Sequence, residues 1–517
     1  MKKTICFMAT LIATAIILLT THCTQRGPLP AIEASPTPVT PPAATPAATA
    51  LPNVPWTNRE FYRSGLTEDA QSVLTRLPGA SVYRIDLDIP NDHTQLQGHE
   101  TVHYTNQETA PLNEIYFRLF PNAAGGKATI ANVKIDGKIV SPIYELQETA
   151  IRLRFPEALE PGAWAEIQMD FQVDVPAEMG GNYSLFGYNS GVLALDKFYP
   201  VIPVYDDEGW NVEIPPENGD LTYYDAAFYE VHVTAPEDLV FATSGVEVAR
   251  EQQEGKQSLT FAAGPARDFY LAASEDYVVL EERVGETTIR SYAPLAYEQH
   301  AELILEFARD ALYSFNRRFG PYPYTEFDFA GISTEISGME YAGIVALSFD
   351  LYEPSGRSRG LPTRVLLESV TAHETANQWF YNMIGSDQLD EPWLDEAMAQ
   401  YSTWLYYLDR YGEETARSYR QSWEDNWSKV GQATTPIGMP SAAYSKEEYS
   451  PIVYGRGPFF LTALEEKMGR KSFDAFLHNY STTHQWGIVT TEEFERLAEA
   501  HCNCDLTSLF ESWVYER

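Results

Sequence analysis

Two short helix-forming runs hold side chains of the types that bind and activate a metal ion. His373 and Asn377 are four residues apart, and this spacing places both side chains on one face of a helix, where they can approach the same ion. Glu374 lies one position round, where a carboxylate can act on a metal-bound water without binding the metal. Glu396, in the run that follows, is suited to be the third ligand. The spacing predicts a metal site of the H-E-x-x-H type.

This site departs from that pattern at one position, because Asn377 stands where a second histidine is expected. A catalytic zinc uses three protein ligands and one open position, and an amide oxygen is a weaker donor to zinc than an imidazole nitrogen. Disturbing the groups around zinc ligands costs roughly 10–100-fold in metal affinity, so we expect replacing a ligand to cost more. We predict one zinc ion, weakly bound by His373, Glu396 and Asn377. The motif alone would more readily suit a surface histidine on a buried helix, with no metal bound.

Three companion segments favour the metal site over that alternative. The run 338–343 (Gly-Met-Glu-Tyr-Ala-Gly) precedes the metal-binding helix and leads into a strand-like run at 344–347. Tyr454 lies at the start of an amphipathic helix. The run 320–324 (Gly-Pro-Tyr-Pro-Tyr) predicts a rigid turn after an earlier helix.

Together these segments resemble the alanyl aminopeptidase (aminopeptidase N) family of gluzincin zinc metallopeptidases, in the form of its short bacterial members. The resemblance extends from about residue 80 to the end of the chain and is most specific between residues 338 and 457. It implies an α+β fold, with an N-terminal antiparallel β-sheet domain packed on a mainly helical, thermolysin-like catalytic domain. It also implies hydrolysis of the N-terminal bond of peptide substrates with zinc as the cofactor.

The same resemblance implies a role for each matching residue. His373 and Glu396 correspond to zinc ligands, and Glu374 corresponds to the general base. Glu340 corresponds to the carboxylate that pairs with the α-amine of the substrate. Tyr454 corresponds to the hydroxyl that donates to the tetrahedral oxyanion. Considered singly, a structural carboxylate at a strand edge and a packing tyrosine are the alternatives for these last two residues.

The predicted substrate-binding group also includes the neighbours of Glu340, namely Gly338, Met339 and Ala342. The family's second amine anchor comes from the N-terminal domain. The run 195–200 is the corresponding region, but no residue in it can be assigned. Two functions therefore stay open: a surface-anchored aminopeptidase with a weakened metal site, and a pseudopeptidase that binds peptide termini without cleaving them. The match of both Glu374 and the catalytic tyrosine to the family pattern favours the enzyme.

The elements that position these residues change type along the chain. Residues 83–89 alternate apolar and charged side chains, which predicts strands with one buried and one solvated face, as in antiparallel sheets. From residue 294 onward apolar residues recur at helical spacing. We therefore predict a β-rich N-terminal domain at residues 56–293 and a catalytic domain at residues 294–517.

The first residues have the pattern of a signal peptide, with two lysines before a short apolar run. We predict a signal peptide at residues 1–22 and a Pro/Ala/Thr-rich tether at residues 23–55. Cys23 resembles the lipid-attachment site of a bacterial lipoprotein. We expect an extracytoplasmic protein, either anchored to the membrane through Cys23 or an uncleaved leader, or secreted.

The net charge of −37 argues against nucleic acid as a partner, since phosphates would be repelled. It predicts an acidic surface, with an acidic cleft that favours basic peptides as the alternative. Cys502 and Cys504 are one residue apart, a spacing expected to strain a mutual bridge, so we predict two ordinary thiols. The sequence does not predict the oligomeric state.

Overall fold

The structure is a computed structural model that describes residues 55–515, apart from 215, 217, 220–222, 354–355 and 359–360. All described residues fall within one compact unit of the chain. The predicted signal peptide, Cys23 and the predicted tether up to residue 54 lie outside the described residues, and these predictions stay untested. Within the described part of the chain, no helix combines the length and the apolar character needed to cross a membrane.

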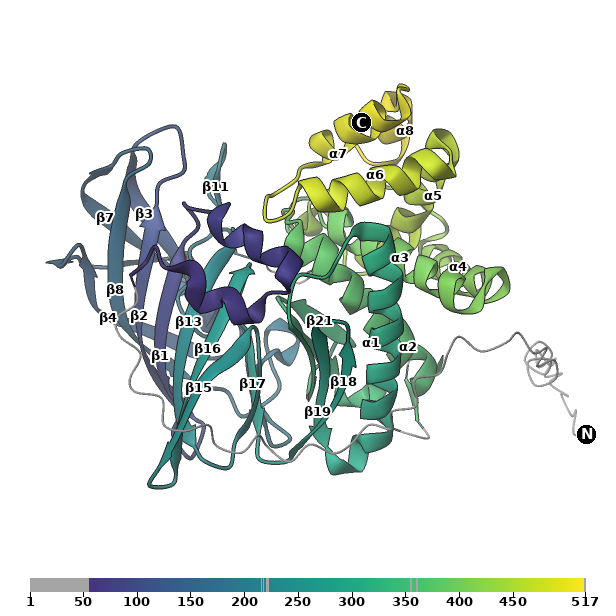
Figure 1. The fold of residues 1–517 in the computed structure, drawn as a ribbon. Helices are drawn as coiled ribbons and strands as arrows, with labels where there is room; N and C mark the ends of the chain where they lie inside the picture. The colour runs from purple at the N-terminus through teal and green to yellow at the C-terminus, as the bar shows by residue number, and fades with distance from the viewer. Residues whose placement is uncertain are drawn as a thin grey trace, which may run out of the picture. The chain divides into compact units, whose positions relative to one another are not determined.

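An eight-stranded, mainly antiparallel sheet dominates the N-terminal half of the described chain (Figure 1). The predicted alternation is confirmed in β1 (Val82–Asp88), where Ile85 and Leu87 are buried and Asp86 and Asp88 are exposed. β1 pairs antiparallel with β2 and parallel with β13. Across the sheet the strands are β15 (Val246–Gln253), β16 (Lys256–Ala266), β13 (Ala227–Pro236), β1 (Val82–Asp88), β2 (Gln95–Thr105), β8 (Trp164–Asp174), β4 (Lys127–Ile135) and β5 (Lys138–Ile139).

Smaller sheets complete this half. One contains β3 (Leu112–Arg118), β7 (Ala150–Leu159) and β6 (Ile143–Glu145), and another contains β14 (Val240–Thr243), β17 (Leu271–Ser274), β10 (Val192–Leu195) and β9 (Phe186–Asn189). A short hairpin joins β11 (Tyr205–Asp206) to β12 (Gly209–Trp210). Two 3-10 helices, Arg59–Gly65 and Glu68–Thr75, precede the first strand.

A five-stranded sheet carries the chain into its second half. Its order is β18 (Tyr277–Val284), β19 (Thr287–Pro294), β20 (Glu326–Ile332), β22 (Ile344–Ser348) and β21 (Gly338–Tyr341). The strand predicted at residues 344–347 is confirmed in β22. Since this sheet takes strands from both sides of residue 293, a boundary there would divide a continuous sheet, and the domain limits stay a prediction. A short β23 (Arg357–Ser358) and β24 (Leu361–Pro362) pair just before the next helix.

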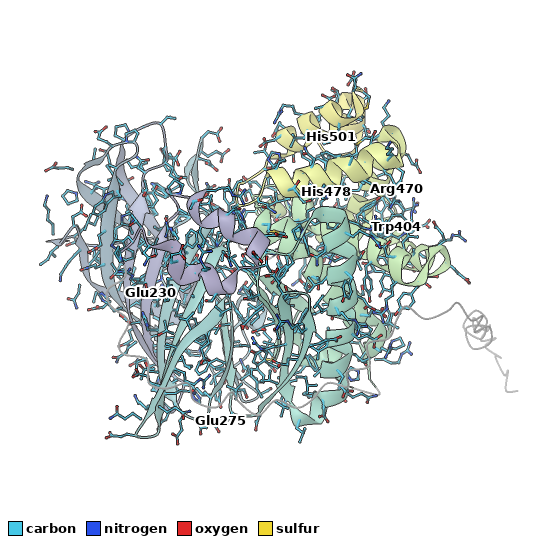
Figure 2. All side chains as sticks on the ribbon, in the orientation of Figure 1. Glu230, Glu275, Trp404, Arg470, His478 and His501 are labelled. Carbon is cyan, nitrogen blue, oxygen red and sulfur yellow. A yellow bond between two sulfur atoms is a disulfide. The ribbon has the colours of Figure 1, made fainter. Side chains whose placement is uncertain are left out.

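The second half is mainly helical (Figure 1). In α1 (Glu298–Phe319), which has the helical spacing of apolar residues predicted for this half, Phe307, Ala311 and Phe315 are buried and Leu303 is half-buried. Figure 2 shows Trp404 and Arg470 on the helical side of the molecule, and the Arg470 guanidinium lies 5.8 Å from the centre of the Trp404 ring. The helices are α1 (Glu298–Phe319), α2 (Thr363–Asn377), α3 (Trp393–Tyr411), α4 (Glu413–Trp427), α5 (Gly457–Met468), α6 (Arg470–Thr483), α7 (Thr491–Cys502) and α8 (Thr507–Trp513). The α+β fold is confirmed.

The prediction of two ordinary thiols near the C-terminus is wrong, because Cys502 and Cys504 form a disulfide. Helix α7 ends at Cys502, and Asn503 adopts a left-handed conformation with φ 50° and ψ 44°. This turn brings the two Cα atoms to 5.2 Å, within the range that a bridge requires. The one-residue spacing was expected to strain such a bridge, but the left-handed Asn503 brings the two cysteines within reach of each other.

Candidate active site

The two predicted strong metal ligands meet between α2 and α3. His373 Nε2 lies 3.0 Å from Glu396 Oε2, although the residues are 23 positions apart in the chain. This separation is short enough for one ion to bind both atoms. Burial lowers the pKa of His373 to about 4, so the imidazole is neutral near pH 7, which is the form that binds metals.

Asn377 is the last residue of α2, and its side chain is completely buried. Neither Oδ1 nor Nδ2 has a hydrogen-bond partner in the described chain. A buried polar group without a partner costs about 1–3 kcal/mol, so such a group in a native site calls for an explanation. An ion or a water held at this position would supply the partner that the protein does not.

The donor set of this site fits a zinc ion with two strong ligands and one weak ligand. His373 offers an imidazole, Glu396 offers a carboxylate, and the unpartnered Asn377 Oδ1 offers a neutral oxygen. Among the residues that the structure describes, no group of three or more His, Cys, Asp or Glu side chains is arranged to hold a metal ion.

Glu374, the predicted general base, is buried beside strand β21. Gly338 begins that strand, and a Cβ atom built on it would lie 2.6 Å from Glu374 Oε1. Real Cβ contacts essentially never fall below 3.0 Å. Only a glycine therefore leaves room for this carboxylate in its present place. Gly338 thus leaves space for Glu374, and its predicted part in substrate binding stays a prediction.

Tyr454 lies in a π-helical turn, Pro451–Arg456, that continues into α5. Its hydroxyl donates a hydrogen bond to Glu396 Oε1. Its ring centre lies 6.0 Å from that of His373, with the two planes 25° apart. His373 of α2 and Tyr454 of this turn therefore both contact the carboxylate of Glu396 on α3.

Glu340, on β21, is buried and accepts a hydrogen bond from Gln388 Nε2 at 3.2 Å. The same Nε2 donates to Asp395 Oδ2 at 2.5 Å, and Asp395 Oδ1 accepts the backbone N–H of Glu396 at 2.7 Å. A chain of hydrogen bonds thus links the predicted amine-binding carboxylate to the metal-ligand helix. The sequence analysis missed Gln388, since no spacing rule marks a glutamine in the loop before α3.

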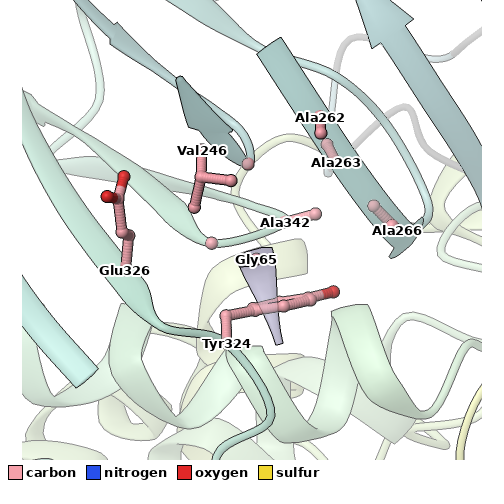
Figure 3. A pocket seen from close by; sticks show the side chains of 11 residues that line it. Gly65, Val246, Ala262, Ala263, Ala266, Tyr324, Glu326 and Ala342 are labelled. Atoms are coloured by element: carbon pink, nitrogen blue, oxygen red, sulfur yellow. The ribbon is translucent and has the colours of Figure 1, made fainter. Parts of the chain in front are cut away.

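The two remaining predicted substrate-binding residues lie in different surroundings. Met339 is buried in β21 opposite Ala346. Ala342 donates its backbone N–H to Asp268 Oδ1 at 3.2 Å and lines a small pocket (Figure 3). The walls of that pocket consist mainly of small residues: Gly65, Gly245, Val246, Ala262, Ala263, Gly264, Ala266, Tyr324, Glu326 and Gly343. Glu340 is not among them, so Ala342 borders a space other than the one around that carboxylate.

The run 195–200 contains a buried ion pair. Lys197 Nζ donates to Asp196 Oδ1 at 2.8 Å, and the ammonium lies 5.3 Å from the centre of the Tyr341 ring. Burial alone would lower the pKa of Lys197, but Asp196 and Asp268 raise it. The lysine therefore stays cationic and is held by Asp196 beside the ring of Tyr341, the residue that follows Glu340 on β21.

Comparison with known proteins agrees with this geometry. The family model described as "Peptidase family M1 domain" matches residues 303–513. Aminopeptidase 2 of Candida albicans is 24% identical over 453 residues, which cover 82% of this chain and 45% of that protein. Aminopeptidase N of Acetobacter pasteurianus is 29% identical over 187 residues, which cover 34% of this chain and 51% of that protein. The chain spans about half the length of the curated relatives it matches.

Solved structures share the fold over most of the chain. An M1 zinc metallopeptidase from Deinococcus radiodurans aligns with a TM-score of 0.62 at 19% identity, covering 84% of this chain and 93% of that one. A mutant of the same protein bound to a Tyr-Ser-Ala substrate aligns with a TM-score of 0.60, also at 19% identity, covering 85% of this chain and 94% of that one. Residues 303–513 match the peptidase family M1 domain, and the chain is similar to aminopeptidases, which agrees with the resemblance seen in its motifs.

Proposed function

We propose that this protein is an aminopeptidase-type zinc metallopeptidase with a weakened metal site. The observation that carries the proposal is the convergence of His373 and Tyr454 on the two oxygens of Glu396. His373, Glu396 and Asn377 would hold the ion, which when bound polarises a carbonyl and activates a water. This convergence brings the predicted ligands and the predicted oxyanion donor to one place, as a metal-centred site requires.

Each of the other side chains of the site has a separate role in the reaction. Glu374, held against Gly338, takes a proton from the attacking water. The Tyr454 hydroxyl, which donates to Glu396 in this structure, can instead donate to the oxyanion that forms on the substrate carbonyl. Glu340 pairs with the α-ammonium and thereby places the first peptide bond at the metal.

The alternative is a pseudopeptidase, and one observation favours it. The Asn377 amide is fully buried with no partner among the described residues, and a neutral amide is a poor substitute for a zinc-binding imidazole. In that case Glu340 would bind peptide termini and no bond would be cleaved.

Hydrolysis of a panel of amino-acid arylamides by the purified, zinc-supplemented protein separates these functions. We expect slow cleavage that Glu374→Gln reduces to background. Cleavage that survives Glu374→Gln could not come from this site. No cleavage by the zinc-loaded protein, together with peptide binding, would establish the pseudopeptidase.

We further propose that the protein works outside the cytoplasm, either secreted or attached to the membrane through Cys23 or an uncleaved leader. The signal-like first residues support this location. The Cys502–Cys504 disulfide also supports it, because disulfides persist mainly in oxidising compartments. Fractionation of cells expressing the full chain, with and without Cys23→Ser, tests the proposal. Recovery of the intact protein in the cytoplasm would contradict it.

A further inference from the structure

The hydrogen bonds of Gln388 fix the orientation of its side-chain amide. A carboxamide has one donor end and one acceptor end. The Nε2 atom donates to Glu340 Oε1 and to Asp395 Oδ2, at 3.2 Å and 2.5 Å. The opposite orientation would place Oε1 against two carboxylate oxygens, and the repulsion would exclude it. The acceptor end therefore has to face something other than these two carboxylates.

That acceptor end has no partner in the described chain. Gln388 is 2% exposed, and its Oε1 is buried without a hydrogen bond. Because Oε1 and Nε2 are on the same amide carbon, the unpartnered oxygen is close to Glu340. A buried oxygen next to a carboxylate attracts a positively charged donor, and a primary ammonium has three N–H groups to offer.

We propose that Gln388 Oε1 is the second acceptor for the α-ammonium of the substrate and completes the amine site with Glu340. This proposal rests on the proposed function. It replaces the anchor that the run 195–200 was expected to supply, where the Asp196 carboxylate is already paired with Lys197. It also defines the substrate class: peptides with a free primary N-terminus bind best, N-alkylated termini bind less well, and N-acylated termini bind worst.

Isothermal titration calorimetry of the full chain tests the proposal without turnover. The parent protein carries Glu374→Gln, is supplied with zinc, and is titrated with trialanine, N,N-dimethyl-trialanine and N-acetyl-trialanine. The first two peptides are cations with three and one N–H groups, and the third is neutral. The parent is expected to bind trialanine about tenfold or more tighter than the dimethyl peptide, since a hydrogen bond to a charged group is worth about that much.

Gln388→Met in this parent removes the acceptor while nearly keeping the side-chain volume. We expect the affinity ratio between trialanine and the dimethyl peptide (the gap) to fall to about threefold or less. The affinity for N-acetyl-trialanine should not change. If Gln388 only positions Glu340, both cationic peptides weaken by the same factor, and an unchanged gap would overturn the proposal.

Gln257→Met is the matched control, because Gln257 is an equally buried glutamine that donates to Pro236 and Leu239 carbonyls in the N-terminal half. It should leave the gap at the parent value. A parent that binds trialanine and N-acetyl-trialanine equally would overturn amine recognition itself, and with it the proposed function. A parent that still prefers trialanine, with a preference that does not depend on Gln388, would instead overturn only the role of Gln388 and leave the proposed function standing.

Discussion

Replacing Gly338 by alanine should disable the general base without touching a metal ligand. The new Cβ would lie 2.6 Å from Glu374 Oε1 and 2.8 Å from Val370 Cγ1, so it meets the carboxylate and the helix that carries it. Ordinary van der Waals contact begins at 3.4 Å, and the oxygen would have to retreat by about 0.8 Å. A misplacement of about 1 Å can cost about 100-fold in rate.

We therefore expect Gly338→Ala to lower kcat/KM for the best arylamide by about 10–100-fold, or about 1.4–2.7 kcal/mol. The crowding should also cost about 1–3 kcal/mol of stability, measured by chemical denaturation. Zinc content, measured on the same samples, should stay at the wild-type value because the ligands do not move.

Gly65→Ala provides the control for this substitution. Its new Cβ would meet Val246 Cγ2 at 3.5 Å, an ordinary contact, in a buried position away from Glu374. It should keep the wild-type kcat/KM. If Gly338→Ala retains more than half of the wild-type kcat/KM while folded, the placement of Glu374 against this strand does not matter for catalysis, and the reasoning fails.

Three further predictions concern the ligand set, the oxyanion donor and the core. Asn377→His should raise zinc affinity about tenfold or more in competition with a chelator, because imidazole is the better donor; unchanged affinity would show that residue 377 does not face the ion. Tyr454→Phe should lower kcat by about 10²–10³-fold with little change in KM; a change confined to KM would contradict an oxyanion role. Glu100 is completely buried, neither of its oxygens has a hydrogen-bond partner in the part of the chain that the structure describes, and burial raises its pKa well above the usual range. The folded chain thus retains a proton that the unfolded chain releases as pH rises past its ordinary pKa, and stability falls with rising pH. Glu100→Met should therefore stabilise the protein at pH 8 and less so at pH 4, by thermal unfolding; equal gains at both pH values would contradict this sign.

Local periodicity was sufficient to predict the elements that carry the site. The alternation in residues 83–89 gave β1, and the apolar face of Phe307, Ala311 and Phe315 gave α1, because in each case one face packs on a core. The spacing of His373 and Asn377 placed both on one helix. These periodicities come from residues that are close together in the sequence, so a sequence pattern can reveal them.

Features that depend on tertiary contact were not predictable in this way. Gln388 acquires its significance only when the loop before α3 folds against Glu340 on β21, 48 residues earlier in the chain. The Cys502–Cys504 bridge forms across a left-handed Asn503, and the spacing of the two cysteines does not reveal that conformation. The pairing of Lys197 with Asp196 likewise depends on burial that composition does not reveal.

Crystals grown with excess zinc, with diffraction data collected on both sides of the zinc absorption edge, test the central claim most directly. We predict an anomalous peak about 2.0–2.2 Å from His373 Nε2 and from a Glu396 oxygen, with Asn377 Oδ1 or a water in the third position. No anomalous density between α2 and α3 would contradict the account, and the family's hydrolytic chemistry could not then be assigned to this chain.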